Sequence, residues 1–239
     1  MGGKWVKPFT PCILPVIVMR EHEPLLNVDL VIFDCDGVLV DSEPIINRAH
    51  AETLRQHGYA VTAEMLAERF TGVSDADMLG TIEREHGIPM PSDYEVRVNA
   101  LIDSYCETSL VATPGTREVL AALEVPVCVA SSGCPARIRN SLRVAGLLDR
   151  FDPHLFSATM VAHGKPAPDL FLHAACTMGM APARCLVVED SAFDVQAAIA
   201  AGMTAIGFCG GSHCRPDHAD FLRKQGATGI IFDMRDLPI

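Results

Sequence analysis

Short apolar runs recur along the chain, and residues with helical patterns separate them. The first run, residues 30–33 (Leu-Val-Ile-Phe), contains no polar side chain, which is typical of a strand buried on both faces. Similar runs lie at 125–130, 185–188, 204–208 and 229–232. Strands that alternate with helices form a parallel sheet with helices on both faces. The sequence therefore predicts an α/β fold with a Rossmann-like parallel sheet.

The segment between the first two runs breaks this alternation. It contains no convincing strand, and glycines separate four amphipathic helical patterns, at residues 45–57, 63–70, 75–86 and 92–108. A helical block enclosed by strand patterns on both sides predicts a small inserted domain. We therefore expect an α/β core of residues 27–42 and 112–239, with a helical cap formed by residues 43–111.

Residues 1–26 differ from the rest of the chain. An apolar stretch at 12–19 follows two lysines, a pattern that superficially resembles a secretory signal peptide. Prolines interrupt this stretch, and no small-residue cleavage site follows it. We expect residues 1–26 to be a disordered extension. The alternative is that the given start lies upstream of the true one, which is Met19.

Composition narrows the class of partner. The chain has 239 residues, of which 49% are hydrophobic and 21% charged, as in ordinary globular proteins. Its net charge of −11 argues against a nucleic acid or an anionic membrane as a partner. Nine scattered cysteines without a CxxC pair indicate reduced thiols and a cytoplasmic protein. No apolar run reaches the ~18 residues of a membrane span. For the oligomeric state, we expect a monomer.

Polar residues follow the predicted strands at the points where ligands bind in a parallel sheet. The carboxyl ends of such strands share one edge, where α/β proteins place their sites. The residues expected at this edge are Asp34, Asp36, Ser131, Ser132, Glu189 and Asp190, with Ser191 and Asp194 just beyond and Lys165 in the connection after the second run.

The two acidic pairs are the centre of this candidate site. Asp34 and Asp36 alternate on an extended segment, so both point the same way and repel each other unless a cation or proton lies between them. Alone, this pair could be a polar turn, and Glu189-Asp190 could be a helix N-cap. Together the pairs predict an oxygen-rich nest suited to Mg²⁺.

Lys165 and Ser131 supply the groups that an anionic substrate needs. Lys165 lies between Gly164 and Pro166, where a rigid loop restricts its freedom. It could screen a carboxylate from a phosphate, or be an ordinary surface lysine. Ser131 could donate its hydroxyl to a phosphoryl oxygen, or cap the helix that follows. A nucleophilic serine is disfavoured because no GxSxG sequence is present.

The constellation resembles the haloacid dehalogenase superfamily, in its phosphatase branch with a small helical cap. Residues 34–43 (DCDGVLVDSE) look like the first motif, Ser131 like the second, Lys165 in GKPAPD like the third, and Glu189-Asp190-Ser191 like the fourth. The match runs from about residue 29 to the C-terminus. Within the family, the sequence looks closest to the beta-phosphoglucomutase-like and 6-phosphogluconate-phosphatase-like members.

This resemblance implies a two-step phosphoryl transfer. Asp34 attacks phosphorus and forms an aspartyl phosphate, while Asp36 protonates the leaving oxygen and then activates water. Mg²⁺ is held by Asp34, the backbone carbonyl of Asp36, and Asp190, with Glu189 as a direct or water-mediated supporter. The phosphoryl oxygens are held by Ser131, Ser132 and Lys165.

Two positions separate the activities of the family. Dehalogenases lack the second aspartate, so Asp36 disfavours that reaction. Mutases carry a cap-hinge histidine where this chain has Ile46, although His50 lies one turn further. We therefore expect a Mg²⁺-dependent phosphatase for a small sugar or sugar-acid phosphate. A sugar-phosphate mutase and a catalytically silent binding protein remain the alternatives.

The cap is expected to read the substrate and to exclude water when it closes. The sequence at 70–74 resembles the substrate-contacting loop of the family. The candidate contacts are Glu43, Thr71, Gly72 and Ser74, with Arg48, His50 and Arg69 as further candidates that could equally be structural. A separate group, Cys209, His213, Cys214 and His218, fits no standard zinc spacing, and we expect a plain surface loop there.

Overall fold

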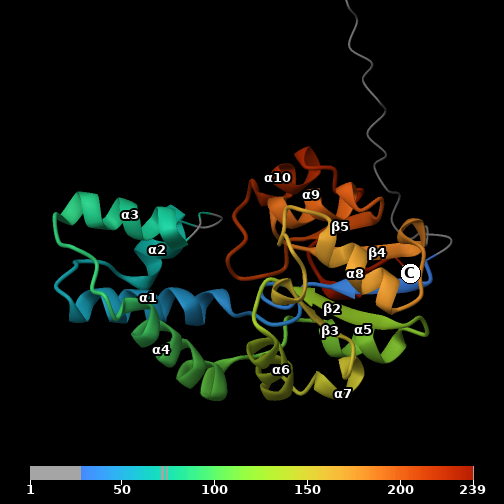
Figure 1. Ribbon diagram of the computed structural model, residues 1–239, viewed down its shortest axis with the longest axis horizontal. Coiled ribbons are helices and arrows are strands. Elements are labelled where there is room, and N and C mark those ends of the chain that lie inside the picture. Colours follow the sequence, from blue (N-terminus) through green and yellow to red (C-terminus); the bar gives the residue numbers. More distant parts are fainter. Residues whose placement is uncertain (1–27, 71–72, 74, 239) are drawn as a thin grey trace, which may run out of the picture.

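A parallel sheet forms the centre of the protein, as a computed structural model of residues 28–70, 73 and 75–238 shows (Figure 1). In this part of the chain six strands lie in the order β3-β2-β1-β4-β5-β6, and every neighbouring pair is parallel. The strands are β1 (Leu30–Phe33), β2 (Val127–Ser131), β3 (Leu155–Ser157), β4 (Cys185–Glu189), β5 (Thr204–Phe208) and β6 (Gly229–Ile231). The predicted α/β fold is confirmed.

The uninterrupted apolar runs arise because helices cover both faces of this sheet. Val31 and Phe33 belong to one hydrophobic cluster, whereas Leu30 and Ile32 belong to a second. The first cluster packs under α5 (Thr116–Ala122), α6 (Pro135–Val144) and α7 (Leu148–Phe151). The second packs under α8 (Asp169–Thr177), α9 (Ala192–Ala200) and α10 (His218–Lys224). Successive strand residues point to opposite faces, so both faces require apolar side chains.

The third strand is the element that the apolar runs did not predict. β3 contains only three residues, Leu155–Ser157, and its last residue is a polar serine. Such a short edge strand leaves no run that is distinguishable from a loop. Its position comes from pairing with β2, where Val129 lies beside Leu155 and Ser131 beside Ser157.

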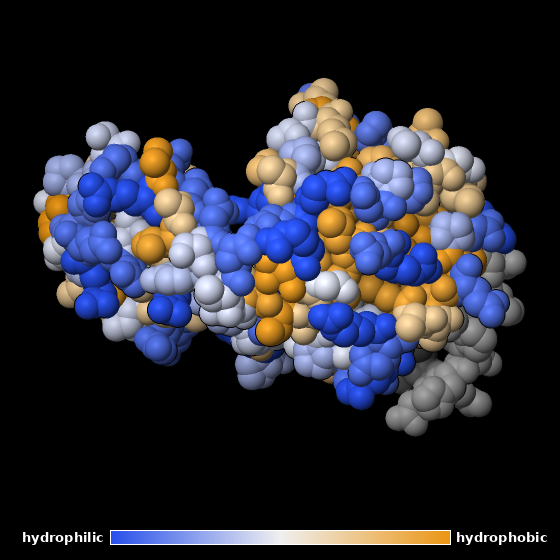
Figure 2. Space-filling model, turned by 90° about the horizontal axis from the view of Figure 1, so that it is seen from below, coloured by the Kyte–Doolittle hydropathy of each residue, from blue (hydrophilic) through white to orange (hydrophobic). Residues whose placement is uncertain are grey.

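Four helices form a second lobe beside the sheet (Figures 1 and 2). They are α1 (Glu43–Gln56), α2 (Ala63–Phe70), α3 (Asp75–His86) and α4 (Tyr94–Ser109), and they cover most of the segment predicted to be a cap. Figure 2 shows this lobe joined to the larger one across a narrow waist. The two linkers run together there, because Val40 forms an antiparallel bridge with Ala112. The Asp41 N–H also donates to the Val111 carbonyl at 3.1 Å.

Some expectations fall outside the described residues. These are the N-terminal extension of residues 1–26 and the cap-loop candidates Thr71, Gly72 and Ser74. Within the described residues, the longest helices are too short or too polar to cross a membrane.

A core substitution tests the packing on one face of the sheet. Phe151 is fully buried and meets Phe33 edge-to-face, with ring centroids 6.0 Å apart. We expect Phe151→Ala to lower the free energy of unfolding by about 3–5 kcal/mol, because it leaves a cavity beneath β1. Urea denaturation measures this loss. Phe232→Ala is the matched control, since Phe232 is 63% exposed, and an equal loss in both variants would contradict the packing.

Candidate active site

The end of β1 places two carboxylates at the edge of the sheet. The Asp34 N–H donates to the Val188 carbonyl at 3.1 Å, which holds this segment against β4. The Asp34 carboxyl is buried, and burial raises its pKa to about 7, with Lys165 opposing the shift. Burial also raises the pKa of Asp36. Carboxyl groups whose pKa values are raised in this way are suited to exchange protons with a substrate.

Gly37 allows the two acidic pairs to approach each other. Its φ angle is +79°, in the left-handed region that favours glycine. A Cβ atom at this position would lie 1.9 Å from Asp190 Oδ2. The turn after β1 can therefore pack against the end of β4 only if residue 37 has no side chain.

Lys165 joins three carboxylates that come from different segments. Its Nζ lies 3.0 Å from Asp34 Oδ1, 2.5 Å from Glu189 Oε1 and 2.9 Å from Asp194 Oδ2. The Lys165 side chain is only 1% exposed. Burial opposes its charge, but the three carboxylates outweigh burial and raise its pKa well above the usual value. Lys165 is thus a buried ammonium that draws the ends of β1 and β4 together.

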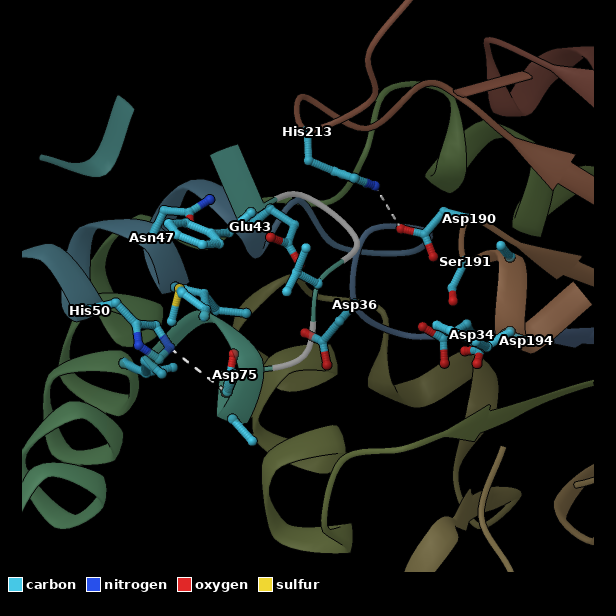
Figure 3. A pocket seen from close by; sticks show the side chains of 18 of the residues that line it. Asp34, Asp36, Glu43, Asn47, His50, Asp75, Asp190, Ser191, Asp194 and His213 are labelled. Atoms are coloured by element: carbon cyan, nitrogen blue, oxygen red, sulfur yellow. Dashed lines mark ion pairs between the residues drawn. The ribbon is translucent and has the colours of Figure 1, made fainter. Parts of the chain in front are cut away.

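Negative charge exceeds positive charge around this ammonium. One lysine faces three carboxylates. Asp190 lines the same cavity as two of them, Asp34 and Asp194 (Figure 3). Burial, together with repulsion from Asp194, raises the pKa of Glu189 well above its usual value. Glu189 Oε2 is buried without a hydrogen-bond partner among the described residues. An orphaned oxygen and an excess of carboxylates fit a hard divalent cation such as Mg²⁺.

The end of β2 contributes a serine that faces the same edge. Ser131 is 2% exposed, and its Oγ accepts a hydrogen bond from the Gly133 N–H at 3.3 Å. A Cβ atom at Gly133 would lie 3.7 Å from Ser131 Oγ and 4.0 Å from Asp36 Oδ2, so this turn adjoins the β1 carboxylates. Ser132 is exposed. Ser131 is therefore the better placed of the two predicted serines.

A cavity of about 1060 Å³ lies between the two lobes and opens onto this site. Figure 3 shows the carboxylates of the core on one side and polar residues of α1 on the other. The core contributes Asp34, Asp36, Asp190 and Asp194, and α1 contributes Glu43, Ile46, Asn47 and His50. The volume accommodates a small phosphate ester together with water.

The candidate cap residues separate into two groups. Glu43 and His50 line the cavity, and the His50 Nδ1 lies 2.7 Å from the Tyr94 hydroxyl. Arg48 instead lies over the Tyr105 ring at 4.1 Å, and Arg69 forms an ion pair with Glu85 at 2.6 Å. These two arginines serve the cap itself, because neither lines the cavity.

The structure adds residues that the motifs did not assign. Asp194, in the first turn of α9, is the third partner of Lys165. Arg137 of α6 lines the cavity and donates to Asn99 of α4 at 3.0 Å. His213, from the loop after β5, lies 2.9 Å from Asp190. The sequence places Asp194 at this edge, just beyond Glu189 and Asp190, but not its contact with Lys165. Arg137 and His213 depend on contacts distant in sequence.

The family assignment follows from comparison with known proteins. Residues 28–202 match the model of the haloacid dehalogenase-like hydrolases, and the chain belongs to that family. The resemblance drawn from the four motifs is confirmed.

Individual relatives narrow this class. The 6-phosphogluconate phosphatase of Escherichia coli is 34% identical over 80% of this chain and 86% of its own. Hexitol phosphatase A of the same organism is 32% identical over 73% of this chain and 80% of its own. A haloacid dehalogenase-like protein of unknown function from Agrobacterium tumefaciens is 40% identical over 88% of this chain and 96% of its own, with a TM-score of 0.81. The two named phosphatases confirm the prediction of a phosphatase of this family.

Removal of the central ammonium tests the charge balance of the site. We expect Lys165→Met to lower the free energy of unfolding by about 3–5 kcal/mol, because it leaves buried carboxylates without their cation. Urea denaturation with a chelator present measures the effect without added metal. Lys224→Met, at an exposed position, is the control and should change stability by less than about 0.5 kcal/mol. Equal stability of the two variants would contradict the role given to Lys165.

Proposed function

We propose that the protein is a Mg²⁺-dependent phosphomonoester hydrolase that acts on a small sugar phosphate or sugar-acid phosphate through an aspartyl phosphate. The observation that carries the proposal is the position of Asp34 and Asp36 at the cavity, with the Lys165 ammonium 3.0 Å from Asp34. The E. coli relatives named for 6-phosphogluconate and hexitol phosphates support this class of substrate.

In the first step, Asp34 is the nucleophile. One of its carboxylate oxygens forms a bond to phosphorus while the bond from phosphorus to the sugar oxygen breaks. Asp36 gives its proton to the departing oxygen, since an alkoxide leaves poorly without protonation. The raised pKa of Asp36 supports this role, because it keeps a proton available on the acid.

In the second step, Asp36 is the base. It takes a proton from a water molecule, whose oxygen forms a bond to phosphorus as the bond to Asp34 breaks. Inorganic phosphate leaves, and both carboxyl groups return to their starting states. Lys165 and Ser131 bind the phosphoryl oxygens and stabilise the charge on them while the bonds from phosphorus to Asp34 and to the sugar or water oxygen form and break.

A bound Mg²⁺ would be held by Asp34, the backbone carbonyl of Asp36, and Asp190. Lys165 already fills the space between Asp34, Glu189 and Asp194, which leaves Asp34 and Asp190 as the pair for the cation. Bound Mg²⁺ would neutralise phosphate charge and align the phosphoryl group with Asp34. Glu189 contacts Lys165 through Oε1, and its unpartnered Oε2 would support the metal directly or through a water molecule.

Hydrolysis is favoured over phosphoryl transfer between sugars. Ile46 lines the cavity at the position where the mutases carry a histidine, and an apolar side chain cannot exchange protons with a sugar hydroxyl. The sugar phosphate mutase is thus the second candidate, and release of free phosphate distinguishes the two reactions.

A substrate panel tests the proposed function. We expect phosphate release from sugar, sugar-acid and polyol phosphates that requires added Mg²⁺ and stops on chelation. Asp34→Asn should abolish turnover, because an amide cannot attack phosphorus, and it preserves the size of the side chain. Ranking by kcat/KM identifies the substrate class. Activity unchanged in Asp34→Asn would sink the proposal, and interconversion of hexose phosphates without phosphate release would establish the mutase.

A further inference from the structure

The loop between β5 and α10 folds against the site instead of lying on the surface. Cys209 is 9% exposed, and the side chain of His213 is 7% exposed. Ser212 holds the loop to the linker of the cap, since its Oγ donates to Asp41 Oδ1 at 2.8 Å. The expectation of a plain surface loop is therefore wrong for Cys209 and His213, whose side chains are packed against the rest of the protein.

Two histidines, His213 of this loop and His218 at the start of α10, hold Asp190 at different atoms. His213 Nε2 lies 2.9 Å from the carboxylate oxygen Oδ2, as the dashed line in Figure 3 marks. His218 Nε2 lies 2.6 Å from the backbone carbonyl of Asp190. A carbonyl oxygen only accepts, so His218 donates its proton there. The two rings meet edge-to-face with centroids 5.7 Å apart. One histidine thus fixes the side chain of Asp190 and the other fixes its backbone.

The packing around Asp190 leaves one carboxylate oxygen for another partner. Oδ2 lies between His213 and the backbone of Gly37, where even a Cβ atom would come within 1.9 Å. Gly211 also brings the loop close to this turn, because a Cβ there would lie 3.0 Å from the Gly37 carbonyl oxygen. Oδ1 is therefore the oxygen that remains for a cation. A donor on the other oxygen of a ligating carboxylate fixes its orientation.

A soft-metal site is the competing interpretation of the same residues. The ligand atoms of His213, Cys214 and His218 lie within 4.8 Å of one another. The Nε2 atoms of both histidines, however, already contact Asp190. A metal that took these nitrogens would release the aspartate, so the observed contacts favour a role in holding Asp190.

We propose that His213 and His218 are positioning residues that orient Asp190 for Mg²⁺, an inference that rests on the proposed function. The loop after β5 and the start of α10 then form a fifth segment of the active site, where His213 and His218 line the same cavity. Hydrogen-bond partners of metal ligands typically contribute 10- to 100-fold in metal affinity. Loss of the His213 contact should weaken Mg²⁺ binding by about that factor.

The test replaces His213 with either of two amide side chains, which have the same functional group but differ in length. His213→Gln can place an N–H where Nε2 lies, whereas His213→Asn is too short to reach Asp190. Isothermal titration of the full-length protein with MgCl₂ should give near-native affinity for His213→Gln and about 10- to 100-fold weaker affinity for His213→Asn. His154→Asn, at an exposed histidine, should bind like the native protein. Saturating Mg²⁺ should restore kcat in His213→Asn. If the substitution instead disrupted the fold, added Mg²⁺ would not restore kcat.

Each outcome has a distinct meaning. If the native protein binds no Mg²⁺, the proposed function fails. If the native protein binds Mg²⁺ and both His213 variants bind it equally well, the positioning role is overturned while the proposed function stands. Tight Zn²⁺ binding that requires Cys214, with Mg²⁺ affinity unchanged in His213→Asn, would also overturn it and establish the soft-metal site.

Discussion

The buried ammonium of Lys165 is the interaction on which the rest of the site depends. It contacts Asp34 after β1, Glu189 at the end of β4 and Asp194 in α9, and its side chain is almost wholly removed from solvent. Without this charge the three carboxylates would repel one another in a poorly solvated space. The same contact ties the loop that carries Lys165 to the centre of the sheet, so the chain connectivity and the electrostatics support each other.

The order of the strands explains why this cluster lies where it does. Strand order reverses between β1 and β4, and their carboxyl ends diverge into connections on opposite faces of the sheet. Asp34 and Glu189 lie at these two ends. Because Gly37 has no side chain, the turn after β1 can also pack against Asp190. The cap linkers leave from the same place, so the cavity between the lobes opens directly onto the carboxylates.

Much of this arrangement could be predicted from local patterns. Five of the six described strands are apolar runs, and parallel topology places Asp34 and Asp190 at one edge of the sheet, because each follows such a run. β3 could not be found, because three residues carry too little pattern and their strand geometry comes from pairing with β2. The path of the loop with His213 was equally hidden, since it depends on the contact between Ser212 and Asp41, 171 residues apart.

In the proposed mechanism, the phosphoryl group is transferred to Asp34 and is then released with the help of Asp36. An aryl phosphate has a leaving group that needs no proton, so Asp36→Asn should still form the covalent intermediate but hydrolyse it slowly. Rapid acid quench of this variant, followed by peptide mass spectrometry, locates the phosphate. We expect phosphate to accumulate on Asp34. Phosphate on another residue, or no phosphorylated peptide while product still forms, would contradict it.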